Sequence, residues 1–418
     1  MKGHQNPVGL PTILALMCVW LASTWTRADG WLIGLAAILL VISQVVQAPV
    51  TAKNSGVLWL VAMTQLLVGA AMYSVLHLFT LSRVTAAVGG CLVVGMGVLI
   101  RYGKVAWATV LLLLHSVVVT GLVLAEDPYP VDVYLVHQEA GRLLASRADP
   151  YSELEVRNRI SEERVTGYPY PPLTLWTYGG LASLGGDPRW VGAFAWLVLV
   201  GLLAIRAKND ALALWILAMG SVAQSTPMML LLTFSELFVA ALVVSSYLLF
   251  REHRKPWAAV LFGLSFGAKQ HLGLALPAAA AAAARPQPKH RLWTTALIAI
   301  GAGLAGGAGF LLSPNAYWEA TVANLAELQP NLEAASLFGM SNGRISTPVA
   351  VAAGLSILAG LFFAARKPAR PLRSIAASVG TFLFFGTTTH WTHWTLIGWL
   401  LTADLILGVD RPIPKAES

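Results

Sequence analysis

Long apolar segments make up most of this chain, and short polar connectors separate them. Because one membrane crossing needs about 20 mostly apolar residues, each long segment predicts a transmembrane helix. Two shorter apolar pieces, 257–268 and 272–284, flank Lys269-Gln-His271, and another occupies 171–186. The pattern predicts an all-α polytopic membrane protein with roughly a dozen to fourteen crossings. The longer segments lie near residues 9–25, 31–49, 56–80, 84–100, 105–125, 190–206, 210–225, 228–250, 292–312, 346–365, 374–389 and 394–409.

One long polar segment, from Glu126 to Tyr170, interrupts this pattern. It is rich in acidic and tyrosine residues and runs into Tyr168-Pro-Tyr-Pro-Pro172. Because a bilayer offers no partners to exposed polar groups, we expect the segment to lie at the membrane surface and to carry chemistry there. The predicted regions are therefore transmembrane helices at 1–125 (about five spans), a catalytic surface loop at 126–170, a transmembrane core at 171–410 and a cytoplasmic tail at 411–418.

Composition excludes a water-soluble globular protein, because 56% of the 418 residues are hydrophobic and only 11% are charged. The net charge of +8 does not indicate nucleic-acid binding, since the basic residues lie in short connectors, as the positive-inside rule expects. Cys18 and Cys91 both fall within apolar segments. We therefore predict no disulfide and no thiol or metal chemistry from the cysteines.

The distribution of basic residues predicts which loops lie on which side of the membrane. With a cytoplasmic N-terminus, the loops 126–170 and 313–345 both lie on the outer face. The basic clusters on either side of 257–284 belong inside, so this pair of short pieces must go out and return, which brings Lys269 and His271 toward the outer face. Broken helices need a cavity or protein partners, so we predict a cavity there. We also expect 171–186 to dip into the membrane without spanning it.

An amphipathic helix is predicted to follow Asp132, since the apolar residues recur at steps of three and four: Val133, Val136, Ala140, Leu143 and Leu144. Such a helix lies in the membrane interface with its apolar side toward lipid or the helical bundle. Asp132 then stands at its N-terminus. Without further information this position is better explained by helix capping, which favours aspartate, than by catalysis.

Lys269 and His271 are the sharpest intramembrane signal, because an ionisable group surrounded by apolar residues is expensive and by default indicates function. The alternative is a lysine that snorkels at a helix end. His390 and His393 lie at the outer end of another predicted helix, beside two tryptophans, and suit a polar headgroup site. Nothing completes a metal-ligand set around them, so we predict no metal site.

Several other residues of the outer face are candidates for substrate contacts. Tyr134, Tyr168 and Tyr170 are typical membrane-interface anchors, but clustered rings beside an acidic residue also suit a sugar site. Asn342 and Arg344, in a glycine-containing loop, could bind phosphate or hydroxyl groups, or simply form a loop.

The order of these motifs resembles the GT-C glycosyltransferases. The motifs are Asp132-Val-Tyr134, Asp149-Pro-Tyr151, Tyr170-Pro-Pro172, Gly-Ala-Lys269 and the late histidine-containing helix. The closest resemblance is to glycosyltransferase family 87, the polyprenyl-phosphate-mannose-dependent α-mannosyltransferases that include phosphatidylinositol mannoside enzymes, and it covers roughly Glu126 to Leu407. The chain departs from the family pattern because about five apolar spans precede its acidic loop, where the family commonly has one helix.

The resemblance implies transfer of a sugar, with mannose the first expectation, from a polyprenyl-phosphate carrier to a glycolipid or glycan acceptor. The reaction would invert the anomeric carbon at the outer face of the plasma membrane, with Asp132 as general base. No cofactor is implied, and a divalent cation is left open. The donor site would include Lys269, His271, Arg344, Asn342, Tyr134, Tyr168 and Tyr170, with His390 or His393 lining the donor or acceptor site.

Two alternatives remain at this stage. A transporter or flippase for a lipid-linked sugar predicts repeated halves with ionisable groups in both, but the first five spans contain no counterpart to Lys269. The same reaction with polyprenyl-phosphate arabinose as donor is not distinguished by any residue.

Overall fold

The computed structural model describes residues 10–22, 35, 38, 79–128, 132–157, 164–284, 300, 301, 303, 304, 313–323, 336, 341, 343, 344, 349–366, 370–385 and 391–407. The predicted spans near 31–49, 56–80 and 292–312 lie almost entirely outside these residues. The described part consists of helices and one short antiparallel strand pair, β1 (Glu155–Arg157) with β2 (Arg164–Thr166). The chain is an all-α polytopic membrane protein, as the apolar pattern predicted.

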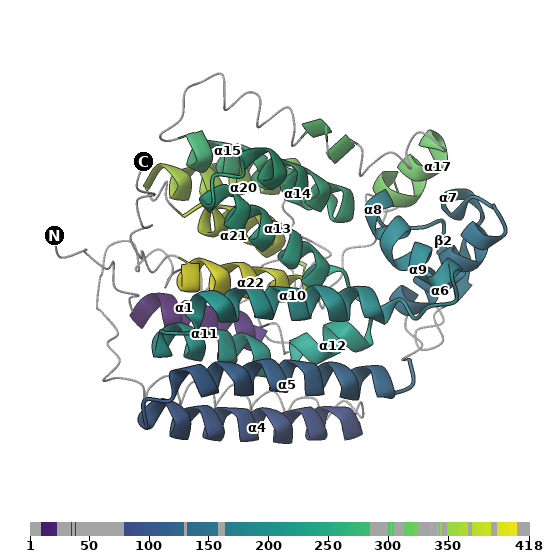
Figure 1. Ribbon diagram of the computed structural model, residues 1–418. Helices are drawn as coiled ribbons and strands as arrows, with labels where there is room; N and C mark the ends of the chain where they lie inside the picture. Colours follow the sequence, from purple (N-terminus) through teal and green to yellow (C-terminus); the bar gives the residue numbers. More distant parts are fainter. Residues whose placement is uncertain are drawn as a thin grey trace.

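A bundle of helices forms the larger part of the molecule (Figure 1). Three of them, α4, α5 and α10, are long and apolar enough to cross a membrane, and the bent pair α11–α12 is a broken span or a re-entrant segment. The helices of the bundle are α1 (Leu10–Ala22), α4 (Phe79–Arg101), α5 (Val105–Ala125), α10 (Arg189–Ala207), α11 (Ala211–Val222), α12 (Ser225–Leu231), α13 (Glu236–Arg251), α14 (Lys255–Ala268), η3 (Gln270–Ala275), α15 (Leu276–Ala284), α20 (Val349–Arg366), α21 (Pro371–Phe385) and α22 (Trp391–Leu407).

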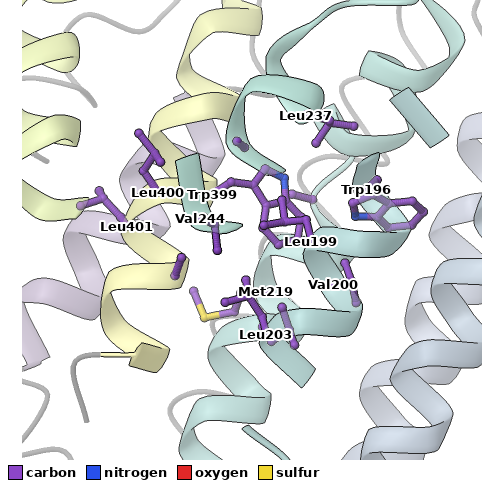
Figure 2. Packing of buried hydrophobic residues seen from close by; sticks show 14 of the residues in the cluster. Trp196, Leu199, Val200, Leu203, Met219, Leu237, Val244, Trp399, Leu400 and Leu401 are labelled. Atoms are coloured by element: carbon purple, nitrogen blue, oxygen red, sulfur yellow. The ribbon is translucent and has the colours of Figure 1, made fainter. Parts of the chain in front are cut away.

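Large side chains from distant helices fill the centre of the bundle. Figure 2 shows Trp196 and Leu199 of α10 close to Trp399 of α22, with Met219 and Val244 nearby. Glycines allow close approach here: a Cβ at position 398 would lie 2.9 Å from the Trp20 ring of α1. Because lipid provides no hydrophobic drive for helix association, such close packing of small against large residues holds the bundle together.

A polar lobe packs at the end of the bundle where α5 ends and α10 begins (Figure 1). We use "the lobe" for α6 (Asp132–Ala145), α7 (Pro150–Glu153), β1, β2, α8 (Pro172–Thr174), η2 (Leu175–Gly179), α9 (Gly180–Ser183), α17 (Pro314–Trp318) and η5 (Glu319–Ala323).

Helix α6 is the amphipathic helix predicted from the sequence, and it begins at Asp132. Its buried residues include four of the five predicted apolar positions, Val133, Val136, Ala140 and Leu143, whereas Leu144 is half-buried. This face packs against η2 and α9, so within the lobe it covers protein. The contact is tight, because a Cβ on Gly141 would lie 2.5 Å from the Ala182 Cβ.

The segment α8–η2–α9 is a short continuous helix with a wide turn in its middle, running from Pro172 to Ser183. At ~1.5 Å per residue it reaches roughly 18 Å, well short of the roughly 30 Å hydrocarbon core of a bilayer. This helix is therefore too short to cross a bilayer by itself, and the prediction that 171–186 dips into the membrane stays a prediction.

Arg189 fastens the lobe to the bundle. Its guanidinium donates to the carbonyl oxygens of Val123 (3.0 Å) and Glu126 (2.8 Å), at the end of α5, and pairs with Asp187 (2.7 Å). These carbonyls have no partner within their own helix. One buried arginine thus satisfies the end of α5 while it begins α10.

Basic connectors gather at the opposite end of the bundle. Arg101 ends α4 and Lys104 precedes α5. Arg206 lies in the last turn of α10 and pairs with Glu252, which follows α13. At this end α21 and α22 are joined by a buried ion pair between Arg373 and Asp404, 2.8 Å long. The two ends of the bundle therefore differ in charge.

Candidate active site

A buried ion pair between Lys269 and Glu236 forms the centre of the candidate site. The Lys269 Nζ atom lies 2.6 Å from Glu236 Oε1. Lys269 is 8% exposed and Glu236 is fully buried at 0%. The sequence singles out Lys269, whereas Glu236 is not among the predicted site residues. The signal for Glu236 is the same one, since an intramembrane carboxylate also indicates function.

Lys269 lies at the predicted break between two short helices. Helix α14 ends at Ala268, the Lys269 backbone is extended (φ −153°, ψ 107°), and η3 begins at Gln270. Two side chains hold this break from either side. The Thr174 hydroxyl of the lobe donates to the Ala268 carbonyl at 2.9 Å, and the Ser378 hydroxyl donates to the Leu274 carbonyl at 3.0 Å. The lobe thereby sets the position of the lysine.

Two of the predicted histidines lie beside the ion pair. The His393 Nε2 atom of α22 is 3.8 Å from Glu236 Oε1. The His271 ring contacts the His393 ring edge-on, with centroids 5.8 Å apart, and stacks on Phe382 at 6.4 Å. Within the described ranges, no group of three or more His, Cys, Asp or Glu side chains is arranged to hold a metal ion.

Tyr170 connects Asp132 to this cluster. Desolvation raises the pKa of the Tyr170 phenol well above its ordinary value, and the negative charges of Asp132 and Glu236 raise it further. The phenol therefore stays protonated and lies within electrostatic range of both carboxylates. The Tyr170 backbone carbonyl in turn accepts a hydrogen bond from the Tyr151 hydroxyl at 3.2 Å. Asp132 and Glu236, far apart in sequence, thus both act on the Tyr170 phenol, and Glu236 is paired with Lys269.

The other two tyrosines make different contacts. Tyr168 is fully buried in the core of the lobe, and its hydroxyl is 3.0 Å from the Nδ1 atom of His137. Tyr134 accepts a hydrogen bond from Gln138 (2.6 Å) and lies in the field of Asp187 and Arg189. The sequence alone gives no reason to assign these two tyrosines a different role from Tyr170. Their contacts indicate that they stabilise the lobe.

His137 links the lobe to the segment before Glu236. Burial lowers the pKa of His137 to about 3, and a backbone contact with Thr233 offsets this only in part. The ring also stacks on Tyr178, with centroids 4.7 Å apart. A neutral, packed histidine is a supporting residue, and sequence reasoning did not single it out.

The remaining predicted residues are not joined to the cluster by the described structure. Arg344 is exposed, near the isolated described positions 341 and 343. Asn342 and His390 lie outside the described residues. Their predicted roles stay predictions.

Comparison with known proteins gives a single kind of match. The profile of Glycosyltransferase family 87 matches residues 168–389, which is more than half of the chain. The matched range includes Tyr170, Glu236, Lys269 and His271, while Asp132 precedes it and His393 follows it. No curated protein and no solved structure matches. With its membrane helices and a buried polar cluster inside the matched range, the chain belongs to glycosyltransferase family 87 and is a membrane glycosyltransferase.

Proposed function

We propose that the protein transfers mannose from a polyprenyl-phosphate carrier to a glycolipid or glycan acceptor, with inversion at the anomeric carbon. The choice of carrier and sugar rests on the resemblance to the mannosyltransferases of the family. The observation that carries the choice of site is the buried ion pair of Lys269 and Glu236, together with a Tyr170 phenol that feels the charges of both Glu236 and Asp132.

The reaction takes place on the extracytoplasmic face of the plasma membrane in this proposal. The basic connectors lie at the end of the bundle away from the lobe. Since basic loops remain on the cytoplasmic side, the lobe and the cluster face outward. A polyprenyl chain could then remain in the bilayer while its phosphate and sugar reach the cluster.

Asp132 acts as the general base. It takes the proton of the acceptor hydroxyl while the hydroxyl oxygen forms a bond to the anomeric carbon from the side opposite the phosphate. The bond between that carbon and the phosphate oxygen breaks, and the polyprenyl phosphate leaves with the electron pair. General-base catalysis of this kind contributes about 10²–10⁴-fold in rate.

The leaving phosphate is held by Lys269 and His271, with Arg344 and Asn342 as further candidates. A buried cation positioned where negative charge develops stabilises the transition state more than it would in water. Glu236 keeps Lys269 in place before the donor arrives. Tyr170 and either His390 or His393 line the donor or acceptor site.

The test is sugar transfer by the purified protein in lipid, with radiolabelled polyprenyl-phosphate mannose and a membrane acceptor extract. We expect the wild type to transfer label and Asp132→Asn to lose at least roughly 100-fold of that activity while it folds and inserts normally. A matched control is Asp210→Asn, since Asp210 caps α11 at the opposite end of the bundle through Leu212 N (2.9 Å). Equal activity of Asp132→Asn and wild type would remove the base assignment.

A further inference from the structure

The segment between α12 and α13 carries buried polar atoms that the proposed reaction has not used. Within the described part of the chain, Thr233 Oγ1, Ser235 Oγ and Glu236 Oε2 find no hydrogen-bond partner. All three residues are buried, with Glu236 at 0% exposure. Because buried polar atoms are nearly always satisfied, three unsatisfied atoms within four residues indicate a place where a ligand supplies the partners.

The backbone of this segment is also unusual. Thr233 has φ 65°, in the left-handed region that a β-branched residue rarely adopts. Backbone hydrogen bonds from Thr233 N to Leu230 O (3.3 Å) and from Phe234 N to Met229 O (3.0 Å) hold it there. The same pair of bonds and a positive φ end other helices at Arg147 and His253, so this turn is a helix C-cap that ends α12 just before the three polar side chains.

The surroundings of Glu236 determine what kind of ligand fits. Glu236 Oε1 is occupied by Lys269, while the phenols of Tyr170 and Tyr178 both lie in the field of the carboxylate. The Tyr178 hydroxyl is likewise without a partner among the described residues. An ionised carboxylate only accepts hydrogen bonds, whereas serine, threonine and tyrosine hydroxyls both donate and accept. A phosphate needs hydrogen-bond donors, and at Oε2 it would meet only another acceptor, whereas at Lys269 it meets a cation. Sugar hydroxyls, which donate and accept in turn, match this set.

We propose that Glu236, with Ser235 and Thr233, forms the subsite that binds the donor sugar, and that Glu236 Oε2 accepts the hydroxyl next to the anomeric carbon. This inference rests on the proposed function. One carboxylate then contacts both halves of the site. Its Oε1 atom accepts from the lysine that binds the donor phosphate, and its Oε2 atom accepts from the donor sugar. The 2-hydroxyl is assigned because, of the ring hydroxyls, it lies nearest to a phosphate attached at the anomeric carbon.

The test measures binding and does not depend on transfer. Four probes are compared on the full-length protein in lipid nanodiscs: farnesyl phosphate, farnesyl-phosphate mannose, and its 2-deoxy and 6-deoxy analogues. For wild type, we expect mannose to tighten binding about 10-fold over farnesyl phosphate, the 2-deoxy analogue to lose that gain and the 6-deoxy analogue to keep it. In Glu236→Gln, whose amide oxygen still accepts a hydrogen bond from Lys269, the mannose and 2-deoxy probes should bind alike, and farnesyl phosphate should still bind.

Two variants keep this test sharp. Glu252→Gln is the matched control, since it changes a glutamate in an exposed ion pair with Arg206 at the other end of the bundle. Ser235→Ala repeats the comparison with a small change if Glu236→Gln does not fold, and it should reduce the gain from the sugar without changing farnesyl phosphate binding.

Each contrary result has a separate meaning. If Glu236→Gln weakens all four probes equally, Glu236 acts only by holding Lys269 and the sugar subsite is overturned. If wild type binds farnesyl phosphate but gains nothing from mannose, the subsite is also overturned while a polyprenyl-phosphate site stands. If wild type binds none of the probes, the proposed donor class fails and the subsite fails with it.

Discussion

Two buried ion pairs lie at opposite ends of the bundle, and they are built differently. At the basic end, Asp404 Oδ2 accepts from both Nε (2.9 Å) and Nη2 (2.8 Å) of Arg373, with Arg370 at 3.5 Å. At the lobe end, Lys269 reaches only Oε1 of Glu236, and Oε2 has no partner among the described residues. A planar guanidinium that donates twice locks two helices together. At the lobe end, the Glu236 Oε2 atom can still accept a hydrogen bond from a substrate, and the lysine ammonium can still donate to one.

Replacing each pair by apolar residues should separate the two roles most strongly. For Lys269→Met/Glu236→Leu we expect transfer to fall by roughly 10²–10³-fold or more, because the donor phosphate loses its cation. Stability should change little, since buried ion pairs can often be replaced by apolar residues of similar size. The measurement is transfer activity together with thermal unfolding in detergent.

The counterpart is Arg373→Met/Asp404→Leu at the basic end. This double variant should retain both folding and transfer, because its pair only joins α21 to α22. A comparable loss of transfer in both double variants would show that the two pairs do not differ in the way we infer.

Single replacements at the basic end should act on stability. Removing only Arg373, as in Arg373→Met, leaves Asp404 buried beside a more distant Arg370 and should destabilise the protein by about 3 kcal/mol. Activity per folded molecule should stay near that of wild type. Thermal unfolding and activity corrected for the folded fraction check this, and Arg366→Met, an exposed change on α20, serves as control.

A smaller effect on transfer should distinguish two side-chain hydrogen bonds that hold the two ends of α14. Thr174→Val removes the hydrogen bond from the lobe to Ala268 O (2.9 Å), and Ser246→Ala removes one from α13 to Ala258 O (2.7 Å). Each should cost about 1 kcal/mol of stability. Only Thr174→Val should also lower transfer several-fold, because Lys269 follows Ala268 directly. Equal activity of the two variants would argue against positioning of Lys269 by the lobe.

The sequence predicted the elements around the site better than the contacts within it. Lys269 could be found because a cation between apolar helices stands out, and α6 because its apolar residues recur with helical spacing. Glu236 carried the same kind of signal, but its partner lies 33 residues away in the chain. Nothing in the spacing links the two.

The tyrosines show why the contacts within the site could not be predicted from the sequence. Tyr168 and Tyr170 are two residues apart in the same proline-rich stretch. The Tyr168 hydroxyl is hydrogen-bonded to His137 in the lobe core, whereas the Tyr170 phenol feels the charges of two carboxylates. The difference arises because their partners come from α6 and α13, far away in the chain, which no local pattern encodes. The strained backbone of Thr233 is equally invisible, since threonine is not a residue that indicates positive φ.

The two ends should also differ in their response to acid, with the smallest effect of the set. The pKa of His137 is lowered to about 3 by burial, against about 6.5 in an unfolded chain. Between these values the unfolded state binds more protons, so stability falls as pH falls below about 6.5, whereas the arginines of the basic end stay charged throughout. From pH 7 to pH 6 this histidine should remove about 0.7 kcal/mol. The measurement is the free energy of unfolding at both pH values.

His137→Asn should show a shallower pH dependence of stability, whatever its overall stability. His253→Asn, at an exposed turn of the basic end with φ 60°, should keep the slope of wild type. Identical slopes for wild type and His137→Asn would mean that the lobe does not hold this histidine neutral, and that acid sensitivity does not distinguish the two ends.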